Sequence, residues 1–279
     1  MKPTCIPAFH SFFSLQAFRL SAFSTALLLL TPGVAFAWGQ GGHNAVASIA
    51  EANLAPKTKA AIERLLGNRS IVYYAMWLDD YRHTPEYKHT ETWHTAAAGA
   101  DFKYAAKPDG KGDVVSAIEQ SMAALANRQS LPAETLALHI RILVHALGDL
   151  HCPGNVEYQS IKTGFSVSIN GRSFNYSSVW NNQVVDAHRW GYIEWNHQTS
   201  KLLSKEKITA LTAGTPRDWF HETALDSRDI YKWAKSGQKL ESDDNTWTDF
   251  LNKAKPFAET QIMKAGHRLA GILNDLFGQ

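Results

Sequence analysis

The chain has 279 residues, with 28 Lys or Arg against 26 Asp or Glu, so its formal net charge is only +2. A chain this close to neutral lacks the broad basic surface that non-specific duplex binding requires, and any attraction for phosphate must be local. Of its two cysteines, Cys5 lies in a leader that we expect to be removed. Cys152 then stays alone, which excludes an intrachain disulfide in the mature protein.

The first 37 residues have the pattern of a secretory signal peptide. Lys2 and Arg19 are their only Lys or Arg residues and no acid is present, and residues 20–30 form an apolar run. Small residues at Ala35 and Ala37 complete a signal-peptidase motif. We expect cleavage before Trp38, which places the mature protein, residues 38–279, in the periplasm or outside the cell.

Cleavage before Trp38 would also create a metal ligand. The new α-amino group would have a pKa of about 7.7–8.0, so a metal can displace its proton near neutrality. No later apolar run approaches the ~20 residues of a membrane span. All nine Trp and eleven of the twelve His fall in the mature part, a composition that favours imidazole and carboxylate zinc chemistry.

Helical patterns dominate the mature chain. Pro56 occupies a first-turn position, Asp113 is a predicted N-cap, and Asn170-Gly171 marks the turn of a short hairpin over residues 165–174. No linker or repeat divides residues 38–279. We therefore predict an all-α, single helical domain with one short β-hairpin, and helices over residues 43–54, 56–66, 114–126, 132–150, about 179–203, 216–234 and 247–277.

Three separate features of the sequence suggest metal ligands. His145 and Asp149 are four residues apart in a predicted helix and therefore share a face. Asp79 ends an apolar stretch, and His94 follows Trp93. Each has a simpler interpretation: a surface or capped pair for His145 and Asp149, a helix-end acid paired with a nearby arginine for Asp79, and a histidine in a buried aromatic cluster for His94.

The order of these features is more specific than any one of them. Trp-Gly-x-x-Gly-His begins at Trp38, Trp-x-Asp-x-Tyr-Arg at Trp77, a Trp-His pair follows, and Leu-Val-His-x-x-Gly-Asp ends at Asp149. This series resembles the zinc-dependent single-strand nucleases of the S1/P1 family, and Gly266-His267-Arg268-Leu269-Ala270 also fits the last helix of that family. Bacterial zinc phospholipases C are more distant relatives in the same superfamily.

The resemblance implies two zinc ions that share Asp149. One would bind Asp79, His94 and His145, and the other would bind His43 together with the amine and carbonyl of Trp38. Two zincs ~3.5–4 Å apart can hold a bridging hydroxide for in-line attack on phosphorus. Asp79 and Asp149 would then be catalytic through the metals they hold, with a weaker assignment for Arg82.

The family's third zinc site is replaced in this sequence. Counting from Asp149 and aligning the hairpin places neutral side chains at all three of its ligand positions, which are Asn155, Ser177 and Asn181. Thr95 stands where family members often carry a base-stacking aromatic residue, and Ala97 stands where an acid usually accompanies the arginine. We therefore expect two zincs and not a third.

A cation could replace the third zinc at the departing oxygen. Arg172 in the hairpin is the first candidate, with the simpler alternative of a solvated turn residue; Lys162 and His151 are further candidates. His151 with Cys152 could bind metal at a frayed helix end, although His151 should point away from Asp149. Glu194 and His197 have a metal-ligand spacing but no matching second pair.

The sequence therefore favours an exported zinc-dependent phosphodiesterase. We expect it to act as an endonuclease or 3'-nucleotidase on single-stranded DNA or RNA. The alternatives are a non-catalytic, zinc-stabilised binding protein and a phospholipase or phosphatase of the same superfamily. A lipase would show an apolar rim at the metal cleft. The sequence implies no obligate protein partner.

Overall fold

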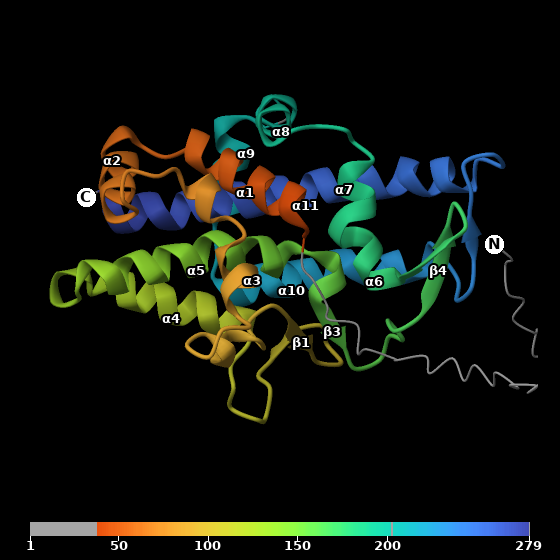
Figure 1. Ribbon diagram of the computed structural model, residues 1–279, viewed down its shortest axis with the longest axis horizontal. Coiled ribbons are helices and arrows are strands. Elements are labelled where there is room, and N and C mark those ends of the chain that lie inside the picture. The colour runs from red at the N-terminus through yellow and green to blue at the C-terminus, as the bar shows by residue number, and fades with distance from the viewer. Residues whose placement is uncertain (1–37, 202, 279) are drawn as a thin grey trace, which may run out of the picture. The chain divides into compact units, whose positions relative to one another are not determined.

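The structure is a computed structural model that describes residues 38–201 and 203–278 (Figure 1). The predicted signal peptide and the cleavage site before Trp38 lie outside the described residues, apart from Trp38 itself. All described residues belong to one compact unit. None of the described helices is both long and apolar enough to cross a bilayer.

Helices build the fold, and the all-α prediction is confirmed. The long helix α5 lies against α4, α11 and α1, and α11 also packs along α1 (Figure 1). The helices of three or more residues are α1 (Gln40–Ala52), α2 (Pro56–Leu65), α3 (Trp77–Tyr81), α4 (Val114–Ala126), α5 (Ala133–His151), α6 (Tyr176–Ser178), α7 (Val184–Asp186), α8 (Tyr192–Thr199), α9 (Lys205–Thr212), α10 (Pro216–Ser227) and α11 (Thr246–Phe277).

Short 3-10 turns and one π-helical turn connect these helices. They are η1 (Ile71–Tyr74), η2 (Lys88–Thr90), η3 (Arg128–Ser130), η4 (Pro153–Asn155), the π turn η5 (Val179–Gln183) and η6 (Arg228–Lys232). The predicted N-cap of α4 is present, because the Asp113 carboxylate accepts a hydrogen bond from the Ser116 amide at 2.9 Å. Pro56 opens α2 as predicted.

The strands are more numerous than the sequence predicted. The expected hairpin is formed by β4 (Ser166–Ile169) and β5 (Arg172–Asn175) around Asn170-Gly171, and β6 (Lys239–Leu240) pairs parallel to β4. A second sheet, which the sequence did not predict, has the order β2-β1-β3, made of β1 (Ala96–Ala98), β2 (Tyr104–Ala105) and β3 (Val156–Tyr158). Strands this short carry little periodicity, so distant pairing decides them.

The predicted helix over residues 179–203 is broken. Arg189 adopts a φ of 58°, a left-handed conformation that ends a helix, and α8 restarts after Gly191. Helix α9, which the sequence analysis missed, begins at the Ser204 side-chain cap. Helix α11 runs from Thr246 through an internal proline to Phe277, as predicted within one residue.

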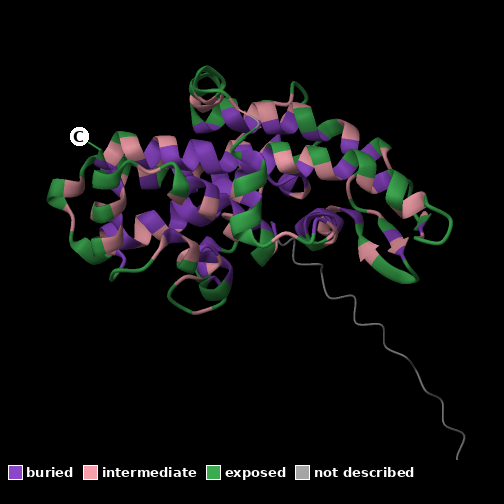
Figure 2. Cartoon of the chain, turned by 90° about the horizontal axis from the view of Figure 1, so that it is seen from above, coloured by how far each residue is buried: buried purple, intermediate pink, exposed green. Residues whose placement is uncertain are grey.

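The core lies where α1, α5 and α11 meet, and buried residues concentrate there (Figure 2). A glycine permits the closest approach of α1 and α11. A Cβ atom added at Gly266 would lie 2.6 Å from both Cβ and Cγ2 of Ile49 and 3.0 Å from the Val46 carbonyl oxygen. This contact sets the position of α1, which carries His43 toward α5.

We predict opposite effects for two glycine-to-alanine substitutions on α11. Gly266→Ala should lower the free energy of unfolding by ~1–3 kcal/mol, because overpacking forces the two helices apart. Gly271→Ala, whose Cβ would meet only Thr212 at 3.6 Å, should raise it by up to ~1 kcal/mol through helix propensity. Urea unfolding of both variants measures this, and an unchanged or higher midpoint for Gly266→Ala would contradict the close approach.

Candidate metal centre

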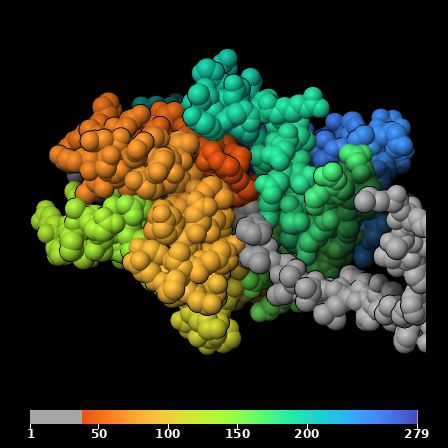
Figure 3. Space-filling view, in the orientation of Figure 1, coloured from red at the N-terminus to blue at the C-terminus, as the bar shows by residue number. Residues whose placement is uncertain are grey.

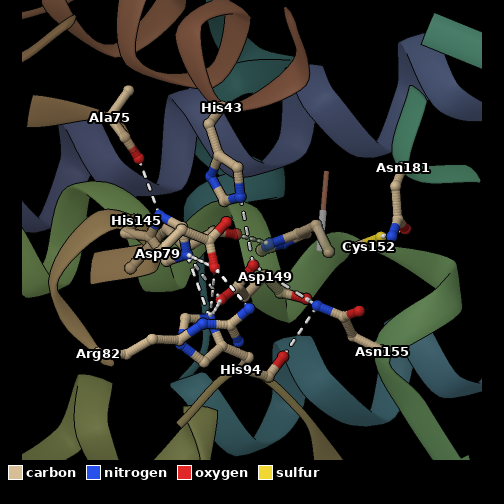
Figure 4. Close-up of polar contacts among 12 residues, drawn as sticks. His43, Ala75, Asp79, Arg82, His94, His145, Asp149, Cys152, Asn155 and Asn181 are labelled. Atoms are coloured by element: carbon tan, nitrogen blue, oxygen red, sulfur yellow. Dashed lines mark hydrogen bonds and ion pairs between the residues drawn. The ribbon is translucent and has the colours of Figure 1, made fainter. Parts of the chain in front are cut away.

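Four segments bring five ionisable side chains together at one buried point (Figure 4). Helix α1 supplies one of them, α3 another, the turn before β1 a third, and α5 the remaining two. Each is at most 8 % exposed. These five residues are His43, Asp79, His94, His145 and Asp149, and we call them the His/Asp cluster.

Asp149 is the centre of the His/Asp cluster. Its Oδ1 lies 3.3 Å from His43 Nε2, and its Oδ2 lies 2.8 Å from His94 Nδ1 and 3.1 Å from His145 Nε2. One carboxylate therefore faces three imidazoles, with one of them at Oδ1 and two at Oδ2. The family resemblance implied that two zinc ions share Asp149, and the structure shows that carboxylate facing three of the predicted ligands.

Asp79 completes the cluster and faces the same two imidazole nitrogens as Asp149 Oδ2. Its Oδ1 lies 3.7 Å from His94 Nδ1 and 3.9 Å from His145 Nε2. The Arg82 guanidinium, one turn further along, approaches the same oxygen at 3.5 Å. The simpler interpretation of Asp79 as an acid paired with Arg82 is thus correct but incomplete, since the carboxylate also faces the two histidines.

Neighbouring backbone groups fix the orientation of the imidazoles. His145 Nδ1 donates to the Ala75 carbonyl at 2.8 Å, which directs Nε2 to the centre of the cluster. His43 stacks on His145 with ring centroids 4.0 Å apart. A Cβ at position 148 would come within 2.7 Å of His43 Nδ1, so Gly148 is required for the stack. These contacts hold the rings before any ligand binds.

The electrostatics of the cluster follow from burying these charges together. Burial by itself would lower the pKa of His145, but Asp149 and Asp79 outweigh it and raise that pKa to about 9. Burial disfavours the Asp149 carboxylate, yet the surrounding histidines hold its pKa well below the usual range. Burial and the neighbouring His145 lower the pKa of His43. The cluster therefore binds positive charge at its centre.

The donor set fits a divalent metal such as zinc. Nitrogen and oxygen ligands ~2.0–2.2 Å from a tetrahedral zinc lie about 3.3 Å from one another. Asp149 Oδ2, His94 Nδ1 and His145 Nε2 lie 2.8–3.2 Å from one another. Both ring nitrogens of His43 and the Nε2 of His94 are buried without a hydrogen bond. Buried polar atoms normally have partners, and a metal would supply one to a ring nitrogen that faces the cluster.

Trp38 lies directly before α1 and is fully buried. The Gly39 amide donates to the Asn181 carbonyl at 2.6 Å, and the backbone of Trp38 interacts with the Cys152 thiol. This places Trp38 near the end of α5, a few residues beyond Asp149. Cys152 is fully buried and burial raises its pKa, so the thiol stays protonated.

The three neutral residues at the predicted third-site positions lie together beside the cluster. Asn155 donates to the His94 carbonyl at 2.8 Å and lies 3.5 Å from Asp149 Oδ1. A Cβ at Gly154 would lie 2.6 Å from the Ser177 carbonyl oxygen and 3.6 Å from Asn181 Oδ1. The segments that carry Asn155, Ser177 and Asn181 therefore meet at Gly154.

The structure does not bring the proposed replacement cations to the cluster. Arg172 lies beside the hairpin turn and is exposed, in a shallow pocket with Ile169 and Gln183. His151 is buried and directed elsewhere: Nδ1 donates to the Leu147 carbonyl, and Nε2 accepts from Arg268, each at 2.8 Å. No described interaction joins Lys162, Glu194 or His197 to the cluster, and all three are exposed.

One polar group beside the cluster was missed by the sequence analysis. Lys107 donates to both Thr95 Oγ1 and Glu157 Oε1 at 2.9 Å, and Thr95 directly follows the ligand candidate His94. The pairing of β1 with β3, which aligns Ala97 with Glu157, brings these residues together. No spacing in the sequence could have shown this, because the three residues are 12 to 62 positions apart.

Comparison with known proteins now adds to this geometry. The family model described as S1/P1 Nuclease matches residues 38–278, which is nearly the whole described chain. The chain belongs to the S1/P1 nuclease family. This confirms the resemblance inferred from the motif order, and the observed helical fold agrees with it.

Individual S1/P1 relatives are similar along almost their full length at low identity. Nuclease S1 from Aspergillus oryzae is 26% identical over 288 residues, covering 93% of this chain and 97% of the relative. Endonuclease 3 from Arabidopsis thaliana is also 26% identical, with 94% and 97% coverage. Nuclease P1 from Penicillium citrinum is 23% identical, with 86% and 98% coverage.

We predict that metal removal will destabilise the protein strongly. Zinc at 1,000 times its dissociation constant adds ~4 kcal/mol, which corresponds to roughly 8–16 °C in melting temperature for a domain of this size. Thermal unfolding with and without chelator measures this. Asp149→Asn is the matched variant and should abolish the difference; equal melting temperatures for zinc-loaded and chelated wild type would contradict a metal in the cluster.

Proposed function

We propose that this protein is an exported, zinc-dependent phosphodiesterase that cleaves single-stranded DNA or RNA as an endonuclease, with two zinc ions and no third. Membership of a family whose relatives are called nucleases and endonucleases supports the reaction class. The observation that carries the proposal is the buried convergence of three imidazoles on the shared Asp149 carboxylate. Export is supported by the signal-peptide pattern of residues 1–37.

The metal ligands proposed are Asp79, His94, His145 and Asp149 for one zinc, and Asp149, His43 and the freed amine and carbonyl of Trp38 for the other. Zinc bound there would supply Lewis-acid stabilisation of charge on the phosphate oxygens and an acidified water as nucleophile. The protein keeps these ligands away from water and fixes their orientation. Ala75 orients His145, and Asn155 holds the backbone at His94.

Arg82 has a supporting role in this proposal. Its guanidinium lies 3.5 Å from Asp79 Oδ1 and is 3 % exposed. This contact holds the Asp79 carboxylate where it faces His94 and His145. Arg82 is thus a positioning residue that acts through Asp79.

A second function is favoured by one observation, the neutral cluster of Asn155, Ser177 and Asn181. All three side chains are neutral, so they supply no positive charge to a leaving group. Loss of such electrostatic help typically costs 10²–10³-fold in rate. A zinc-stabilised binding protein is therefore the alternative, and a superfamily phospholipase or phosphatase is a further outcome of the test.

The decisive assay uses protein with a free Trp38 amine, loaded with zinc and incubated with single-stranded and duplex oligonucleotides. We expect cleavage of the single strands only, abolished by chelator and lowered at least 10³-fold in Asp149→Ala. Asp229→Ala, an exposed acid that pairs with Lys232, is the matched control and should retain wild-type activity.

The same assay separates the alternatives. Zinc binding without cleavage of any oligonucleotide, nucleotide or phospholipid would reject the hydrolase and leave the binding protein. Cleavage that persists in Asp149→Ala would reject the proposed ligand set.

A further inference from the structure

Two hollows open side by side along the first turns of α1. One has a volume of about 620 Å³ and lies between α1 and the segment of η1 and α3; the other, of about 410 Å³, lies between α1 and residues 182–192. They share Gln40, Asn44 and Tyr192 as lining residues, so they form one continuous depression. We call it the α1 groove.

The surroundings of the α1 groove are visible on one face of the molecule. In Figure 3 the orange-red start of α1 emerges between the orange segment that holds η1 and the teal segment that holds α8. Both η1 and α8 pack against α1. The walls of the groove are therefore carried by ordered segments that meet on the helix of His43.

Exposed aromatic side chains mark the groove as a binding surface. Tyr73 is 66% exposed and Tyr192 is 43% exposed, and they are two of only four large hydrophobic residues exposed in the described part of the chain. Both line the groove, together with the half-buried Trp190. The Arg69 guanidinium already lies over the Tyr73 ring, 5.0 Å from its centroid. Such open aromatic faces stack on bases or other flat rings.

The polar groups of the groove select for base edges more than for phosphates. Side-chain amides of Gln40, Asn44 and Asn68 line it, and an amide can both donate to and accept from a base edge. Asp80 offers a carboxylate to the exocyclic amino groups of bases. Arg69 is the only cation among the lining residues of both hollows, whereas a phosphate-tracking surface carries several.

The groove lies along two of the helices that carry the His/Asp cluster. Its lining residues Asn44 and Asp80 directly follow the cluster residues His43 on α1 and Asp79 on α3. Met76, another lining residue, follows Ala75, whose carbonyl orients His145. A nucleotide seated in the groove would thus lie against α1 and α3, two of the four segments that supply the cluster.

We propose that the α1 groove binds unpaired nucleobases of the strand whose phosphodiester is held at the cluster, with Tyr73 and Tyr192 as the stacking residues. This inference rests on the proposed function. Base binding in the groove would also explain a preference for single strands. Bases in a duplex are stacked and paired, so their faces are not available to the tyrosines.

Tyrosine variants test the groove through the kinetics of cleavage. Tyr73→Ala and Tyr192→Ala should each raise KM for a single-stranded 12-mer by at least ~5-fold, the lower end of what stacking on one base contributes, and leave kcat nearly unchanged. Tyr73→Phe and Tyr192→Phe should restore wild-type KM, since they keep the aromatic face. Ile193→Ala, 56% exposed on the same helix as Tyr192, is the matched control and should behave as wild type.

A second measurement does not depend on cleavage. A labelled peptide nucleic acid 12-mer carries bases but no phosphodiester, so its binding to zinc-loaded protein, followed by fluorescence anisotropy, reports base recognition alone. We expect binding that weakens at least ~5-fold in each alanine variant. If the protein binds this probe but cleaves nothing, the proposed reaction fails and the groove stands. If KM and probe binding are unchanged in both alanine variants, the groove assignment is overturned.

Discussion

The Asp149 carboxylate, fully buried and facing three imidazoles, is the interaction on which the rest of the structure depends. An ionised carboxylate away from water is costly unless positive charge or hydrogen bonds surround it. Here the compensating groups come from α1, from the turn before β1 and from α5 itself. Those three segments cannot move apart without leaving Asp149 uncompensated, so the cluster fixes the centre of the fold as much as the fold fixes the cluster.

Two glycines and one short sheet allow the fold to form this arrangement. Gly266 lets α11 press against α1, and Gly148 leaves room for the His43 ring beside α5. The short sheet of β1 with β3 places His94 and Asn155 next to each other, and their hydrogen bond closes the cluster on the side away from α1. The segments that carry Asn155, Ser177 and Asn181 meet at Gly154, and the α1 groove, where we propose that bases bind, lies along the helix of His43.

Much of this could be predicted from the sequence because the helices are long and strongly periodic. The pair His145 and Asp149 follows from helix geometry, and α11 from its apolar pattern. Only the order of the motifs assigned Asp79 and His94 to the same site as that pair, because no local rule relates residues 51 to 70 positions apart. The Lys107, Thr95 and Glu157 contact was beyond any such rule, because it requires pairing between strands of two and three residues.

Some predictions fell short for physical reasons that particular residues show. The helix over residues 179–203 was interrupted where Arg189 adopts a left-handed conformation, which is uncommon for an arginine and leaves no pattern in hydrophobicity. Arg172 was expected near the third-site residues because it lies in the hairpin. The strand pairing instead puts Arg172 opposite Ile169, at the turn end of the hairpin, while Ser177 follows its other end.

Anomalous diffraction at the zinc absorption edge, on crystals of zinc-loaded protein matured to Trp38, will show whether the His/Asp cluster is a metal centre shared through Asp149. We expect two anomalous peaks within bonding distance of Asp149, one beside Asp79, His94 and His145 and one beside His43 and the Trp38 amine. The absence of any peak among these residues, with zinc bound elsewhere or not at all, would contradict that assignment.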